Sequence, residues 1–179
     1  GRRKGLFANS SIADAYTPRI SGAEETMNTN EVFYSMIGID EPSWAQRSAD
    51  YALSVLDALG KKDWQISLTF CDDNTIQTLN RDYRHVDSPT DVLSFVLGEY
   101  EPIEGSESIY LAGDIVISIP AIKRNAEEYG VGEDEELRRL IIHGILHLTG
   151  MSHEDDSPDQ PMLLLQEQLL KTLGGNVIL

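Results

Sequence analysis

The chain has 179 residues, with 14 lysines and arginines against 30 aspartates and glutamates, and a formal net charge of −16 at pH 7. Such an acidic charge excludes a protein that coats nucleic acids without regard to their sequence, because that binding depends on an excess of lysine and arginine. A composition of 41% hydrophobic and 25% charged residues is typical of a globular protein, and this length predicts one domain with a self-sufficient core.

Cys71 is the only cysteine, which excludes an intramolecular disulfide and a thiolate metal cluster. No run approaches the roughly 18 apolar residues of a membrane span. We therefore expect a soluble, cytoplasmic protein without a secretory signal.

Residues 1–29 have few periodic apolar positions and begin with a short basic run. Asp14, Glu24 and Glu25 nearly cancel the charge of that run, which weakens the case for a nucleic-acid-binding arm. We expect these residues to be a flexible tail or a remnant of expression. Residues 30–179 are then expected to form a single metal-dependent domain.

From residue 30 onward, short β-branched runs alternate with stretches that are apolar every three or four positions. Asp72 or Asp73 is expected to cap one helix, and Pro120 suits the first turn of another. The pattern predicts strands over 31–39, 65–70, 92–97 and 110–118, and helices over 42–59, 72–84, 120–130, 133–149 and 161–173. Four strands and five helices, with the helices concentrated late in the chain, predict an α+β fold: a small mixed four-stranded sheet packed with about five helices.

Three of the four histidines lie within eleven residues. His143 and His147 are four positions apart, so both imidazoles lie on one face of the expected helix and can reach one ion. Gly150 is placed to end that helix and turn the chain, which brings His153 to the same point. Three neutral imidazoles with one open position are the ligands of a catalytic zinc, and we expect one Zn²⁺ per chain. Nickel, cobalt and copper also suit these ligands.

The spacing His-x-x-x-His-x-x-Gly-x-x-His is that of the metzincin proteases. Those enzymes place a glutamate directly after the first histidine as the general base, whereas this chain has Gly144 there. Glycine has no side chain that can accept or donate a proton, so the zincin route to peptide hydrolysis lacks its general base. The small residue instead suggests a close approach by a strand or a bulky substrate beside the metal-binding helix.

Three blocks of the sequence resemble the YbeY endoribonucleases, bacterial ribosomal RNA maturation factors. The most specific block is 143–153, His-Gly-Ile-Leu-His-Leu-Thr-Gly-Met-Ser-His. The second comprises 79–84 and 87–95, and the third is 113–118. The resemblance covers about residues 30–175. It implies a four-stranded mixed sheet with surrounding helices, a zincin-like metal helix, and cleavage of single-stranded RNA in the maturation of the 3′ end of small-subunit rRNA and in ribosome quality control.

By the same resemblance, His143, His147 and His153 match the metal ligands, and Arg84 matches an arginine needed for activity. Two departures are present: the family usually has Asp where this chain has Ser152, and Pro where it has Val96. The first removes a carboxylate next to the metal ligands, for which the expected substitutes are Glu154, Asp155 and Asp156.

RNA cleavage develops negative charge on the phosphoryl oxygens, which requires a cation and a proton acceptor. Zinc supplies a Lewis acid and lowers the pKa of its bound water to about 7. We expect His143 and Arg84 to be catalytic, with Arg84 clamping the phosphate through its planar fork. Thr90, Asp91 and Arg139 are the further candidate substrate-binding residues, because Thr90 and Asp91 follow the proline turn within the second block and Arg139 lies one helical turn before His143.

The expected partners are single-stranded RNA, small-subunit rRNA, the small ribosomal subunit and its assembly factors, without a membrane. Two other functions stay open. The metzincin spacing favours a metallopeptidase or other metal hydrolase, although Gly144 opposes the peptidase. The other is a non-catalytic ribosome assembly factor whose fold is stabilised by zinc.

Overall fold

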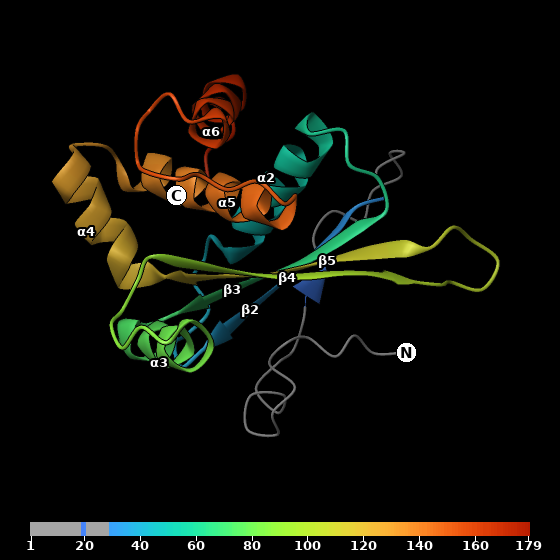
Figure 1. The fold of residues 1–179 in the computed structure, drawn as a ribbon, viewed down its shortest axis with the longest axis horizontal. Helices are drawn as coiled ribbons and strands as arrows, with labels where there is room; N and C mark the ends of the chain where they lie inside the picture. The colour runs from blue at the N-terminus through green and yellow to red at the C-terminus, as the bar shows by residue number, and fades with distance from the viewer. Residues whose placement is uncertain (1–18, 21–28) are drawn as a thin grey trace.

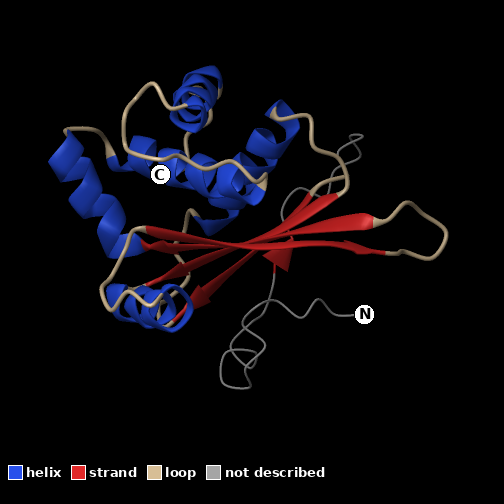
Figure 2. Cartoon of the chain, viewed as in Figure 1, coloured by secondary structure: helices blue, strands red, loops and turns tan. Residues whose placement is uncertain are grey.

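The computed structural model describes residues 19–20 and 29–179. The rest of the expected tail, residues 1–18 and 21–28, lies outside the described residues. A single sheet has the strand order β1-β2-β3-β5-β4. Figures 1 and 2 show helices on both faces of this sheet and a long hairpin that extends beyond them.

The central strands are parallel and the two edges are antiparallel. β2 (Glu31–Ile37), β3 (Trp64–Cys71) and β5 (Ile109–Ser118) run in the same direction. The edge strands are β4 (Val92–Glu101), which pairs with β5, and the two-residue β1 (Arg19–Ile20), which pairs with β2. The mixed α+β fold is confirmed, and the short β1 adds a fifth strand to the four that were predicted.

The five predicted helices are all present, with ends that differ by a few residues. They are α2 (Ala45–Ala58), α3 (Asp73–Arg84), α4 (Ile119–Tyr129), α5 (Glu133–Leu148) and α6 (Pro161–Thr172). The carboxylate of Asp72 accepts a hydrogen bond of 2.8 Å from the backbone N–H of Thr75, so Asp72 is the predicted cap of α3.

The two faces of the sheet are covered by different helices (Figure 1). The larger core includes Leu56 of α2, Ile115 of β5 and Ile141 of α5, all fully buried. The smaller core lies under α3 and includes the fully buried Cys71, and burial raises the pKa of its thiol to about 12. Cys71 is thus a buried residue of the smaller core, and its thiol is not ionised at neutral pH. Within the described residues, no helix has the length and apolar character needed to cross a membrane.

β4 is longer than predicted. The sequence pattern suggested an end at Leu97 because Gly98 normally marks a turn. The pairing of β4 with β5 instead shifts register between Val96 and Glu99 and then continues to Glu101. A bulge accommodates the glycine, and the hairpin therefore projects well past the core.

Candidate metal centre

The three histidines predicted as ligands converge on one point. One ring nitrogen of each lies within 4.8 Å of the corresponding nitrogens of the other two. His143 and His147 are one turn apart on α5, which ends at Leu148. Gly150 then has a φ of +94°, a conformation that glycine adopts without strain, and the chain turns so that His153 faces the other two rings.

The opposite nitrogen of each ring is held by an oxygen atom. Nδ1 of His147 lies 3.1 Å from the carbonyl of Met151, and Nδ1 of His153 lies 3.0 Å from the carbonyl of Asp155. Nδ1 of His143 lies 2.7 Å from Oε1 of Gln166 on α6. Because these oxygens only accept hydrogen bonds, each Nδ1 carries the proton and each Nε2 presents a lone pair.

The Nε2 atoms of His143 and His147 are 3.0 Å apart. Two lone pairs at that separation repel each other unless a cation lies between them. Two nitrogens bound at about 2.0–2.1 Å to one tetrahedral zinc would be roughly 3.3 Å apart, which is close to the observed spacing. The three histidines are therefore close enough, and in the correct tautomers, to bind one metal ion.

Burial favours the neutral form of two of the ligands. It lowers the pKa of both His143 and His147 below the usual range of histidine, and for His147 the neighbouring His143 lowers the pKa further. Neutral imidazole is the form that binds metals. We expected a nearby carboxylate to replace the one lost at Ser152. A backbone carbonyl instead holds Nδ1 of His153, and the Asp156 side chain is 3.8 Å from Nδ1 and fully exposed.

Gly144 allows α5 to pack directly on the sheet. A Cβ atom at this position would lie 2.7 Å from Cγ2 of Ile115 on β5, closer than real Cβ contacts permit. The glycine is therefore explained by the close approach of a strand, one of the two explanations that the sequence suggested. On the neighbouring strand, the hydroxyl of Ser94 donates a hydrogen bond of 3.3 Å to the carbonyl of Gly144.

Arg84 is the last residue of α3 and extends toward the same region. Its Nη2 donates a hydrogen bond of 2.6 Å to the carbonyl of Ser94, and its guanidinium lies 5.6 Å from the ring centre of Phe95. The positive charge of Arg84 also contributes to the lowered pKa of His147. Within the described part of the chain, Arg84 forms no ion pair and is exposed. It therefore offers a free positive charge next to the three histidines.

Thr90 and Asp91 immediately precede β4, and Asp91 joins a polar network. Its carboxylate accepts hydrogen bonds from the backbone N–H of Val92, at 2.7 Å, and from Nδ2 of Asn125, at 2.9 Å. The same amide nitrogen donates at 3.2 Å to Glu136, a buried glutamate of α5 whose pKa is raised by burial. The charge of Asp91 acts on His143 as well, so Asp91 lies near the centre.

Arg139 lies one turn before His143 but is engaged by carboxylates. Its Nε donates at 2.9 Å to Glu167 of α6, and its other nitrogens lie 3.4 Å from Glu135 and 3.5 Å from Glu136. The structure thus gathers the three histidines, Arg84 and Asp91 in one region, while Arg139 is committed to ion pairs.

Four functional neighbours could not be inferred from the sequence: Ser94, Asn125, Glu136 and Gln166. Each reaches the centre from a different element, and none belongs to a spacing pattern with the histidines. Gln166 in particular follows three leucines in α6 and has no signal of its own in the sequence; the structure shows it 6% exposed, with its amide oxygen at His143.

The comparisons with known proteins agree with this geometry. The sequence profile of the family described as "Endoribonuclease YbeY" matches residues 35–174. A protein named Endoribonuclease YbeY from Treponema denticola is 55% identical over 124 residues, which cover 69% of this chain and 80% of the relative. One from Treponema pallidum strain Nichols is 46% identical over 142 residues, covering 79% of this chain and 88% of the relative.

A solved structure has a similar fold. The solution structure of TM1509 from Thermotoga maritima is similar with a TM-score of 0.55 and 26% identity, over 79% of this chain and 89% of that one. The profile match spans most of the chain, and the identities to the Treponema proteins are high over most of both chains. The chain therefore belongs to the Endoribonuclease YbeY family.

Proposed function

We propose that this endoribonuclease cleaves single-stranded RNA at one zinc ion per chain, held by His143, His147 and His153. The observation that carries the proposal is the convergence of the three rings, one nitrogen of each lying within 4.8 Å of the other two. When bound, the ion would supply a Lewis acid for a phosphoryl oxygen and would acidify water. In this proposal, residues 30–179 form a single metal-dependent endoribonuclease domain.

Arg84 would hold the scissile phosphate. Ser94 contacts both Arg84 and Gly144, so it fixes the guanidinium at the edge of the metal-binding helix. One N–H of Nη2 is used for the carbonyl of Ser94. The remaining N–H groups of the guanidinium are available for phosphate oxygens. Thr90 and Asp91 would border the same substrate, and Arg139 would contact RNA only by exchanging Glu167 for a phosphate.

The substrate that we propose is small-subunit rRNA, at its 3′ end, in cytoplasmic maturation and quality control of ribosomes. Several cations near the three sequence blocks are neutralised by carboxylates: Arg81 by Asp82, Arg124 by Asp73 and Arg138 by Asp134. A protein of charge −16 with so many paired cations should bind isolated RNA weakly and with strong salt dependence. Specificity would then come from the small ribosomal subunit and its assembly factors.

The metallopeptidase alternative is disfavoured by the packing at Gly144. A glutamate at this position would collide with Ile115, so the helix has no room for the zincin base. A non-catalytic, zinc-stabilised assembly factor is separated from the nuclease by the experiment that follows.

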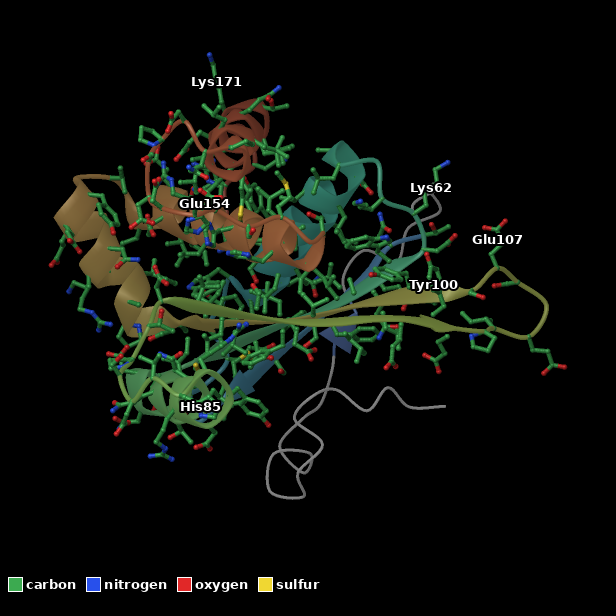
Figure 3. The ribbon with its side chains drawn as sticks, in the orientation of Figure 1. Lys62, His85, Tyr100, Glu107, Glu154 and Lys171 are labelled. Atoms are coloured by element: carbon green, nitrogen blue, oxygen red, sulfur yellow. The ribbon has the colours of Figure 1, made fainter. Side chains whose placement is uncertain are left out.

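The test is cleavage of a short single-stranded RNA that spans the 3′ end of small-subunit rRNA. The fourth histidine provides a matched control, because His85 is exposed at the end of α3, on the other face of the sheet from α5 (Figure 3). We expect cleavage by the wild type and by His85→Ala, none by His147→Ala, and loss of bound zinc in His147→Ala alone. A folded His147→Ala protein that still cleaves would contradict the proposal, and so would a zinc-loaded wild type that cleaves neither this RNA nor the assembled subunit.

A further inference from the structure

The projecting hairpin carries a row of aromatic rings on one face of the sheet. Tyr100 of β4 and Tyr110 of β5 are directly opposite in the register, with ring centres 4.9 Å apart. Tyr110 also contacts Trp64 of β3, again with ring centres 4.9 Å apart. The row therefore runs from a half-buried tryptophan to Tyr100, which is 74% exposed. Figure 3 shows Tyr100 on the part of the hairpin that extends past the helices.

Acidic side chains surround the exposed end of this row. Glu99 and Glu101 are the neighbours of Tyr100 along β4, with side chains on the opposite face of the strand, and Glu104 and Glu107 lie in the loop that joins the two strands. No lysine or arginine occurs anywhere in residues 85–122. The hairpin thus combines a strongly exposed tyrosine, the 39% exposed Ile103 of the loop, and four glutamates without a compensating cation in the hairpin.

We propose that this aromatic, acidic hairpin is a docking surface for an extended, arginine-rich segment of a partner protein. A guanidinium stacks well on a tyrosine ring, and the other arginines of an extended segment can pair with the glutamates of the hairpin. Exposed aromatic residues are the side chains most often found at the energetic centre of protein interfaces. RNA fits less well, because its phosphates would meet four glutamates, and a second copy of this hairpin would be repelled for the same reason.

The docking surface is separate from the metal centre. Ser94, which contacts α5 beside His143, precedes Tyr100 by six residues of the same strand, or about 20 Å at the rise of an extended chain. A partner held at the hairpin would therefore leave the histidines and Arg84 accessible. The inference goes beyond RNA cleavage and does not depend on it.

The chain contains a control of matched composition. Residues 99–101 read Glu-Tyr-Glu on the hairpin, and residues 127–129 read Glu-Glu-Tyr at the end of α4, where Tyr129 is 63% exposed. Changing both glutamates to Gln and the tyrosine to Ala removes the same groups from either place. The hairpin variant is Glu99→Gln/Tyr100→Ala/Glu101→Gln, and the control is Glu127→Gln/Glu128→Gln/Tyr129→Ala.

The probes are a fluorescent ten-residue peptide of alternating arginine and glycine and a twelve-nucleotide oligouridylate, titrated separately into the full chain. We expect the hairpin variant to weaken peptide binding at least about tenfold, the loss typical of a hot-spot residue, and the control to change it less than about twofold. RNA cleavage by the hairpin variant should equal that of the wild type.

Three results would overturn the docking proposal: no peptide binding by the wild type, an equal loss of peptide binding in both variants, or a loss of oligouridylate binding in the hairpin variant with peptide binding intact. The last result would assign the hairpin to RNA. Absence of RNA cleavage by every form would count against the proposed nuclease function and would leave the peptide result valid.

Discussion

The Nδ1 atom of His143 lies 2.7 Å from Oε1 of Gln166, 23 residues later in the sequence. This contact joins the first candidate metal ligand on α5 to the helix that packs beside it. Both the proton position on His143 and the orientation of its ring depend on the contact, because a ligand histidine is oriented by the hydrogen bond of its other nitrogen.

Replacing Gln166 should weaken metal binding. Gln166→Leu keeps a similar volume but removes the acceptor for Nδ1, and we expect the affinity for zinc to fall about 10–100-fold. Gln166→Glu keeps an acceptor and should bind zinc at least as well as the wild type. The measurement is competition with a chromophoric chelator, with Gln168→Leu, at an exposed position of the same helix, as the control. Equal zinc affinity in Gln166→Leu and Gln168→Leu would show that the contact does not orient the ligand.

Arg84 should be needed for cleavage rather than for folding. We expect Arg84→Ala to lower kcat/KM for the single-stranded RNA by about a hundredfold, because a cation aimed at the developing phosphoryl charge is lost. Arg84→Lys should recover only part of this, since lysine lacks the planar fork. Arg81→Ala removes an exposed arginine of the same helix that is paired with Asp82, and it should change the rate little. Similar rates for Arg84→Ala and Arg81→Ala would remove Arg84 from the mechanism.

Gly144→Ala should destabilise the protein although alanine is the better helix former. The added Cβ would lie 2.7 Å from Ile115, and overpacking of this kind costs about 1–3 kcal/mol, against a gain of up to about 1 kcal/mol from helix propensity. Gly175→Ala, where a Cβ meets nothing within 4 Å, should change the free energy of unfolding by less than about 0.5 kcal/mol. Urea denaturation of the metal-free proteins measures both, and a Gly144→Ala protein as stable as the wild type would show that the helix shifts freely.

The metal-free protein should lose stability as the pH falls below about 6.5. Burial lowers the pKa of His143 and His147 in the folded state, so the unfolded chain takes up protons first. Because stability falls wherever the unfolded state binds more protons, the loss begins near the pKa of an unfolded histidine and continues down to the lowered folded values.

The urea midpoint at pH 7.5, 6.5 and 5.5 in the presence of a chelator measures this dependence. The double variant His143→Asn/His147→Asn lacks both groups and should show a smaller decrease over the same interval, which separates the histidines from the carboxylates. A decrease of equal size in both proteins would assign the pH dependence to other residues.

Local patterns predicted most of the secondary structure, because the signals involved act over a few residues. The cap at Asp72, the proline at the start of α4 and the apolar period of α5 each depend on neighbours within one or two turns. Two features were missed: the two-residue β1, and the extent of β4, where Gly98 indicates a turn but pairing with β5 continues the strand to Glu101.

The sequence by itself determined the three convergent histidines, since a spacing of four on a helix followed by a glycine turn leaves their rings little choice of direction. Tertiary structure decided what surrounds them. Gln166 meets His143, Ser94 meets both Arg84 and Gly144, and Arg139 is paired with Glu167 only because separate helices and strands pack at specific positions along their lengths. Such contacts join residues tens of positions apart and leave no periodic signal, so the packed fold alone distinguishes an available arginine from a neutralised one.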